Sequence, residues 1–133
     1  LGAEGVASHG TDIYDKMFDY THHIKGGLYT REVVIPKGTI GVSFIHKQDH
    51  PSFLLKGDFS VLQDTGEVLR LKAPMKIMTE VGTQRVFYAH EDTTWVCVYR
   101  TDKLTVEEAE KDVYTLDFRE LPQSITRKKI CQE

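Results

Sequence analysis

Short stretches of alternating apolar and polar residues, separated by turn residues, run through the middle of the chain. Alternation with a period of two is typical of β-strands, and regular spacing of such strands is typical of sandwiches and barrels. Proline and glycine mark turns at Pro36–Gly38, Lys56–Asp58 and Asp64–Gly66. The pattern predicts about eight strands, at residues 28–35, 39–46, 52–55, 59–63, 67–72, 73–80, 85–90 and 93–100.

The pattern changes after Arg100. Thr105 is followed three residues later by Glu108, which is the spacing of a helix capping box. This spacing predicts one short helix that ends near Val113. Apolar residues then alternate with polar ones over residues 114–118, which is compatible with one further edge strand.

These patterns divide the chain into three parts. We expect an N-terminal arm at residues 1–26, a β-barrel at residues 27–102, and a short helix with a C-terminal tail at residues 103–133. The first dozen residues are rich in glycine, alanine and serine and lack periodicity, as in a flexible leader. They contain no basic and apolar regions of a secretory signal, so we expect no export by a signal peptide. The missing initiator methionine indicates a processed or partial product.

Composition indicates a globular protein without a nucleic-acid or membrane partner. The chain has 133 residues, 40% of them hydrophobic and 28% charged, and a net charge of −3. No apolar run approaches the roughly 18 residues of a membrane helix. The basic cluster Arg127–Lys129 is interpreted as a solvated terminus. The two cysteines, Cys97 and Cys131, lie far apart, and Cys97 is interpreted as a small core residue.

Several segments together resemble one known superfamily. They are GLYTREVVIPKGT, the HKQDH segment that begins at His46, the glycine turn at Gly57, and EVGTQRVFYAHEDTTWVCVYRTD. They resemble the cupin superfamily and, more narrowly, the small cupin-like proteins encoded in bacteriophage genomes. The match covers about residues 26–102. The resemblance implies an all-β fold, the cupin double-stranded β-helix or jelly roll, here with N- and C-terminal arms and one short C-terminal helix.

The resemblance also implies where a metal would bind. Metal-dependent cupins use two histidines and a glutamate from a first motif and a later histidine from a second. In this chain the first histidine is His46, the second position holds Gln48, the glutamate position falls at Ser52 or Phe53, and the last histidine position holds Arg85. A guanidinium keeps its proton and cannot bind a cation. The expected ligand set is therefore degenerate.

His50 is a possible replacement for the missing second histidine. On a continuous strand it would lie about 13 Å from His46, at about 3.3 Å per residue. Only a bulge or tight turn, which Asp49 and Pro51 favour, would bring both rings to one ion, and Asp49 or His90 would then add a ligand. In the alternative interpretation His46 is a hydrogen-bonded interior histidine and His50 is a loop residue.

Arg85 allows two interpretations of its own. An arginine that points into a barrel must be paired or hydrated, and Glu32 or Glu80 would be structural partners. Alternatively, it would bind an anionic ligand such as a carboxylate or phosphate. The candidate ligand-binding residues are thus His46, Gln48, His50 and Arg85, and the candidate divalent-metal ligands are His46 and His50.

No catalytic residue is assigned. The chain has no phosphate-binding loop and no nucleophile elbow, and Cys97 has no histidine near it in the sequence. Phe87, Trp95 and Tyr99 are interpreted as residues that line the barrel, with a stacking platform for a sugar or base as the alternative.

Two hypotheses of function follow. The favoured one is a non-catalytic structural or assembly protein of a bacteriophage particle, without a cofactor. Its arms would attach it to further copies of itself or to other virion proteins, in the virion or the host cytoplasm. The alternative is a small-molecule-binding or metal-dependent cupin enzyme with a degenerate histidine site.

Overall fold

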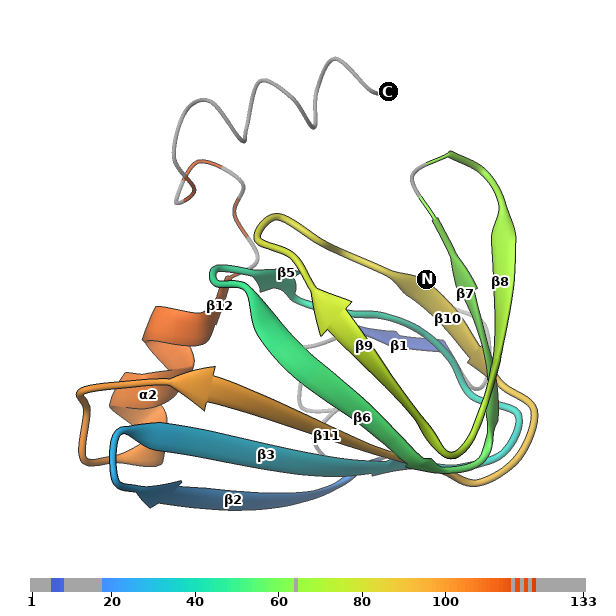
Figure 1. The fold of residues 1–133 in the computed structure, drawn as a ribbon. Coiled ribbons are helices and arrows are strands. Elements are labelled where there is room, and N and C mark those ends of the chain that lie inside the picture. The colour runs from blue at the N-terminus through green and yellow to red at the C-terminus, as the bar shows by residue number, and fades with distance from the viewer. Residues whose placement is uncertain are drawn as a thin grey trace.

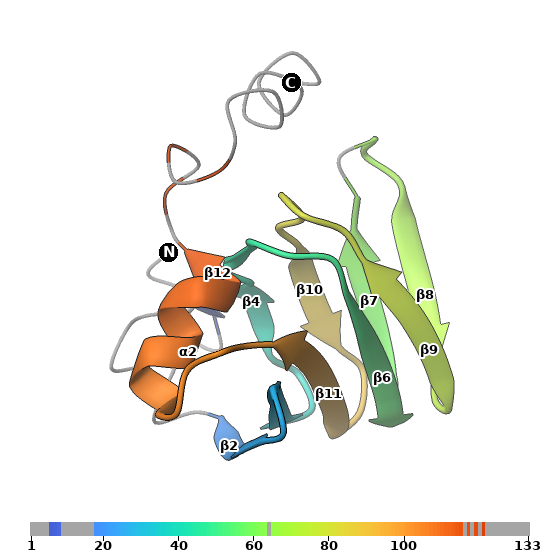
Figure 2. The same ribbon diagram turned by 60° about the vertical axis from the view of Figure 1, so that its left-hand side comes forward.

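Two five-stranded β-sheets face each other and enclose the core (Figures 1 and 2). The computed structural model describes residues 6–8, 18–63, 65–115, 117, 119 and 121. In spatial order, the first sheet contains β1 (Val6–Ser8), β4 (Ile40–Val42), β10 (Val86–Ala89), β7 (Asp58–Leu62) and β8 (Val68–Lys72). The second contains β2 (Asp19–Lys25), β3 (Leu28–Ile35), β11 (Thr93–Arg100), β6 (His50–Lys56) and β9 (Met75–Thr79).

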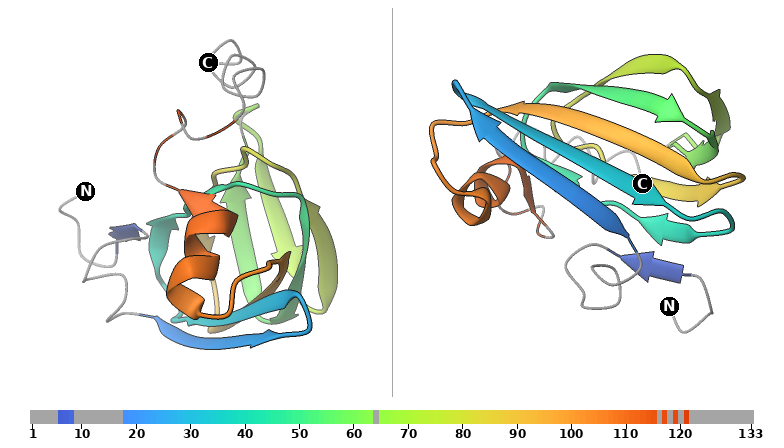
Figure 3. Two further views of the ribbon diagram at one scale, coloured as in Figure 1. Left: turned by 90° about the vertical axis from the view of Figure 1, so that its left-hand side faces the viewer. Right: turned by 90° about the horizontal axis from the view of Figure 1, so that it is seen from below.

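A third, two-stranded sheet and a helix lie at one end of this sandwich. β5 (Ile45–His46) pairs with β12 (Tyr114–Thr115), and α2 (Val106–Val113) lies across the same end (Figure 3). The predicted N-cap is confirmed, because Thr105 Oγ1 accepts a hydrogen bond from the Glu108 amide at 3.3 Å. No helix within the described residues is long and apolar enough to cross a membrane.

The predicted all-β jelly roll is confirmed, and two strands have the predicted bounds, β3 and β11. The single strand predicted at residues 39–46 is wrong. The chain leaves the first sheet at Ser43 and Phe44, so that β4 and β5 belong to different sheets. The Ser43 amide instead bonds to the Arg85 carbonyl at 2.8 Å. This crossing turns His46 toward the end of the barrel that α2 covers.

Two strands lie within the predicted N-terminal arm at residues 1–26. β2 pairs with β3 along its whole length, from Asp19 opposite Val34 to Lys25 opposite Leu28. The strand is not predicted from the sequence because its inner face is only half-buried and includes a histidine, His22. β1 also lies within the predicted arm and pairs with β4. Residues 1–5, 9–17, 116, 118, 120 and 122–133 of the predicted arms lie outside the described residues.

The interior has two apolar clusters with polar residues between them. One cluster fills the middle of the sandwich and contains Val33, Leu54, Phe59, Phe87 and Trp95, among others. The other packs beneath α2 and contains Tyr29, Tyr99, Ala109, Val113 and Tyr114, among others. Along β3 the inward positions run from Tyr29 through Arg31 to Val33. A charged residue thus sits where the two clusters meet.

Gly57 joins β6 to β7 at a point where no side chain fits. Its φ is +112°, and an added Cβ would lie 2.8 Å from Thr93 Cα and 2.9 Å from the Asp92 carbonyl oxygen. We expect Gly57→Ala to lower the free energy of unfolding by about 2–4 kcal/mol. Gly66→Ala is the control: its φ is +87° with nothing within 4 Å, and its cost is about 1 kcal/mol. Urea denaturation measures both variants. Equal losses of the free energy of unfolding would contradict a steric cost specific to Gly57.

Candidate functional site

A row of polar residues crosses three strands inside the barrel. Cys97 on β11 lies opposite Arg31 on β3 and opposite Ser52 on β6. Strand alternation points all three inward. Cys97 is 7% exposed, Arg31 5% and Ser52 2%. The Ser52 hydroxyl lies 3.6 Å from Cys97 Sγ and 3.0 Å from the hydroxyl of Thr79. The row continues in this way onto β9.

Arg31 is a buried cation without a carboxylate partner. Its guanidinium carbon lies 4.9 Å from the centre of the Tyr114 ring and 5.8 Å from that of the Tyr20 ring. Within the described residues its Nε has no hydrogen-bond partner, and no carboxylate forms an ion pair with it. Burial by itself lowers its pKa, but neighbouring phenol and thiol groups raise the pKa well above its ordinary value. Arg31 therefore stays charged.

His46 and His50 meet inside the barrel. A continuous strand would separate them by about 13 Å, but the chain bends at Lys47 and Gln48 and so follows the alternative of a turn. The two ring centres lie 4.8 Å apart. Nδ1 of His50 donates to the Gln48 carbonyl at 3.0 Å. Nε2 of His50 and Nδ1 of His46 are buried without a hydrogen-bond partner among the described residues.

The environment of His46 favours the neutral ring. Burial is the main cause that lowers its pKa well below 6.5, and the charges of His50, Arg31 and Arg85 add to it. Below about pH 6.5, the His46 ring therefore takes up a proton in the unfolded chain but not in the folded protein. His46 therefore leaves the free energy of unfolding unchanged above this pH and lowers it progressively as the pH falls below it.

A pH titration of stability tests this effect. We expect the free energy of unfolding to fall more steeply below about pH 6.5 in the native protein than in His46→Gln, by up to about 1.4 kcal/mol per pH unit. Urea denaturation from about pH 7 to about pH 5 measures both slopes. Parallel slopes for the two proteins would show that His46 takes up its proton equally well when folded.

Arg85 enters the barrel from the segment between β9 and β10. Its backbone amide donates to Ser43 Oγ at 2.9 Å, and its guanidinium donates to Thr79 Oγ1 at 3.3 Å. The predicted ion pair with Glu32 or Glu80 does not form, and Arg85 makes no ion pair with any described carboxylate. Burial lowers its pKa, although an arginine remains protonated.

The other candidate ligands have partners elsewhere. The Gln48 amide is held by the backbone of Arg100, to which it donates at 3.0 Å and from which it accepts at 2.8 Å. Asp49 accepts from the Val81 amide at 2.8 Å, and His90 contacts the Ser60 hydroxyl at 2.6 Å. The structure therefore brings His46, His50 and Arg85 into the interior, but it does not bring Gln48, Asp49 or His90 to them.

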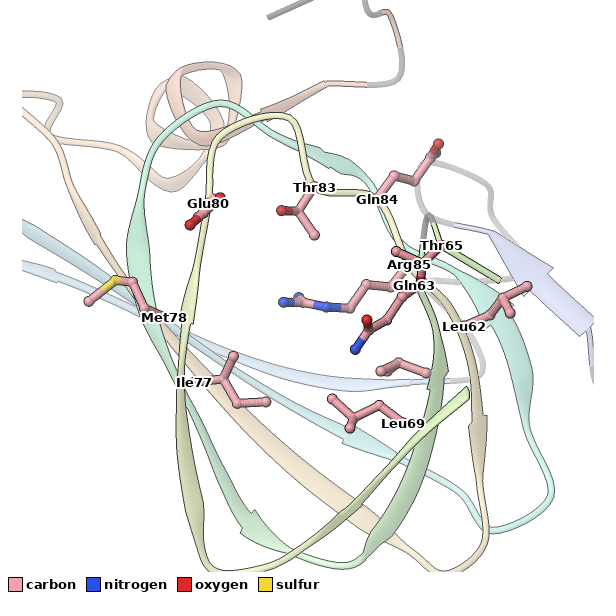
Figure 4. Close-up of a pocket in the computed structure, with 11 residues that line it drawn as sticks. Leu62, Gln63, Thr65, Leu69, Ile77, Met78, Glu80, Thr83, Gln84 and Arg85 are labelled. Carbon is pink, nitrogen blue, oxygen red and sulfur yellow. The ribbon is translucent and has the colours of Figure 1, made fainter. Parts of the chain in front are cut away.

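Two hollows meet at Arg85. The inner cavity has a volume of about 70 Å³, and its polar wall includes Arg31, His46, Ser52, Arg85 and Cys97. The outer pocket has a volume of about 630 Å³ and lies between the β7–β8 hairpin and β9 (Figure 4). Arg85 lines both and points from the wall into the space between these strands. Its guanidinium thus stands between the outer pocket and the buried row.

Cys97 carries more chemistry than its sequence context indicates. The structure places His50 beside it, although no histidine is near it in the sequence. Burial alone would raise the pKa of the Cys97 thiol, but contacts with His50 and Ser52 and the charge of Arg31 lower the pKa to about 6. No aspartate or glutamate lines the inner cavity. Arg31 and Arg85 are therefore two cations in a wall that holds no carboxylate.

This set of side chains does not fit a divalent metal. Within the described residues no group of three or more histidine, cysteine, aspartate or glutamate side chains is placed to hold an ion. The charges of Arg31 and Arg85 also oppose a cation in the cavity that they line. The same charges favour an anion.

Arg31 and Cys97 are not among the candidate residues from the sequence. Arg31 alternates in the sequence with Tyr29, Val33 and Ile35, which are the buried positions of β3. A charged residue at a position where the alternation predicts an apolar one was therefore the signal that could have identified it. The position of Cys97 beside His50 depends on the pairing of β6 with β11, which no local pattern reveals.

Comparisons with known proteins identify the fold. Neither a protein-family model nor a curated protein sequence matches the chain. Ectoine synthase from P. lautus is similar in structure, with 16% identity, a TM-score of 0.59, and coverage of 73% of this chain and 72% of that one. An acetylacetone dioxygenase from Acinetobacter johnsonii is also similar in structure, with 14% identity and a TM-score of 0.52. The match covers 65% of this chain and 64% of that one.

A third similar structure is the cupin_2 domain of an XRE family transcriptional regulator from Enterobacter cloacae. It has 8% identity and a TM-score of 0.52, and the match covers 65% of this chain and 99% of that domain. These neighbours are cupin-fold proteins, so the chain has the cupin fold. At such low identity the likeness concerns the fold alone. It does not test the bacteriophage resemblance, which stays a prediction.

Proposed function

With the cupin fold as the premise, we propose that this protein binds a small monoanion, such as a carboxylate, in the inner cavity between Arg31 and Arg85. The observation that carries the proposal is a pair of inward arginines without a carboxylate partner among the described residues. An uncompensated buried charge is strongly unfavourable. A bound anion would supply the missing charge.

The inner cavity suits a carboxylate group in size and charge. Its volume of about 70 Å³ exceeds the 10–15 Å³, roughly, that one water requires. This small volume favours a carboxylate group over a bulkier anion, and two guanidinium groups without a carboxylate in the wall supply the positive charge. A guanidinium can donate two parallel hydrogen bonds to a carboxylate. Nδ1 of His46, which also lines the cavity and lacks a partner among the described residues, can donate a further one in the tautomer that carries its proton there.

This function corresponds to the small-molecule-binding alternative from the sequence, without a metal. Similar folds occur in enzymes such as ectoine synthase, but a fold does not specify a reaction. We therefore assign binding and no catalytic step. The bacteriophage structural role and the expected homo-oligomer stay predictions, which purified particles and size measurements in solution would test.

A melting experiment with acetate and acetamide tests the proposal. The two molecules are similar in shape, but only acetate is charged. At constant ionic strength we expect acetate to raise the melting temperature in a saturable manner, because a ligand that binds the folded state stabilises it. Acetamide is expected to have no such effect. Equal responses to the two molecules would contradict the proposed anion site.

A further inference from the structure

The outer pocket has apolar walls on both sides of Arg85. The side chains of Leu69 on β8 and Ile77 on β9 point into the pocket from opposite sides, whereas those of Leu62 and Met78 lie at its edge and point away from it (Figure 4). Leu62, Leu69 and Met78 are 43%, 42% and 61% exposed. Apolar side chains that gather around a hollow are typical of sites that bind an apolar group.

The polar part of this pocket is nearly neutral. Its other lining residues include Gln63, Thr65, Thr83 and Gln84, and the single described carboxylate among them is Glu80. Arg85 is the single described cation, and its guanidinium also borders the inner cavity. Glu80 and Arg85 together leave the described lining without net charge, and the positive charge lies where the pocket meets the inner cavity. Its volume of about 630 Å³ falls within the range of roughly 300–1,000 Å³ of small-molecule sites.

We infer that the ligand is a monocarboxylic acid with an extended apolar chain. The carboxylate would reach Arg85 and the inner cavity, and the chain would lie in the outer pocket between the inward side chains of Leu69 and Ile77. This inference rests on the proposed function and adds the chemical class of the ligand. Charge complementarity supports it, because the cation and the apolar walls match the two ends of such an acid.

A series of linear acids tests the inference. NMR titration of the full chain with acetate, butyrate, hexanoate and octanoate gives a dissociation constant for each. We expect the affinity to rise about two- to fourfold for each added methylene. Octanamide, which has the same chain without the charge, is expected to bind at least about tenfold more weakly than octanoate.

Two matched variants locate the chain. Leu69→Ser removes an apolar wall of the outer pocket, and we expect it to reduce the preference for octanoate over acetate at least about threefold. Val68→Ser changes the neighbouring residue, which is 68% exposed and does not line the pocket. We expect Val68→Ser to leave this preference unchanged.

The outcomes separate this inference from the proposed function. If acetate binds and longer acids bind no more tightly, the inference fails and the proposed anion site stands. If none of the acids binds, both fail. If octanoate and octanamide bind equally, the outer pocket recognises the chain alone, and the role of Arg85 in the inference is overturned.

Discussion

Replacing Arg31 with methionine is expected to make the ligand-free protein more stable and to abolish its response to acetate. Methionine keeps much of the length of the side chain and removes the charge. Arg31 is 5% exposed and lacks a carboxylate partner in the described residues. Exchange of poorly compensated buried charges for apolar groups is often stabilising, by about 1–4 kcal/mol. We therefore expect a melting temperature higher by about 3–5 °C for each kcal/mol gained.

The contacts of Arg31 with Tyr20 and Tyr114 and the nearby Cys97 thiol act against this gain. Calorimetric melting of Arg31→Met, with and without acetate, measures both effects. Arg70→Met is the control, since Arg70 pairs with Asp58 at the surface. Loss of this surface ion pair should change neither the melting temperature nor its response to acetate strongly. A variant that melts below the native protein would show that these contacts outweigh the cost of burial, and that Arg31 has a structural role.

Replacing Arg85 with methionine is expected to weaken acetate binding about 30-fold or more. The loss of one partner from a buried, hydrogen-bonded charge pair typically costs about 2–5 kcal/mol of binding free energy. Arg85 makes one side-chain hydrogen bond in the described structure, to Thr79 at 3.3 Å. Its loss should therefore change stability much less than it changes binding.

Arg85→Lys separates charge from geometry. Lysine keeps the positive charge but cannot donate two parallel hydrogen bonds to a carboxylate. We expect an affinity between those of the native protein and Arg85→Met, measured by the same NMR titration. Native affinity in both variants would contradict a direct contact between Arg85 and the anion.

Local patterns in the sequence predict most of this fold. Alternation indicates β3 and β11 with their bounds, and the capping box indicates the start of α2. Such signals depend on neighbours in the sequence, which is why they can be read without a structure. The strand β2 is not predicted from the sequence, because its inner face is partly polar and only half-buried.

The candidate site depends on pairings between distant strands. His46 and Arg85 are identified as positions of interest by resemblance, but the partner of Arg85 is Thr79 rather than Glu32 or Glu80. The excess positive charge appears only when β3, β6 and β11 pair and bring Arg31 and Cys97 into one row. Local sequence patterns carry no information on such pairings.

The central claim is that an anion occupies the inner cavity, and bromide provides the most direct measurement of it. Bromide is a compact monoanion that anomalous X-ray scattering can locate in crystals soaked with sodium bromide. The account predicts an anomalous peak in the cavity bordered by Arg31, His46 and Arg85, and the loss of this peak in Arg31→Met. Bromide peaks on the protein surface with none in this cavity would contradict it.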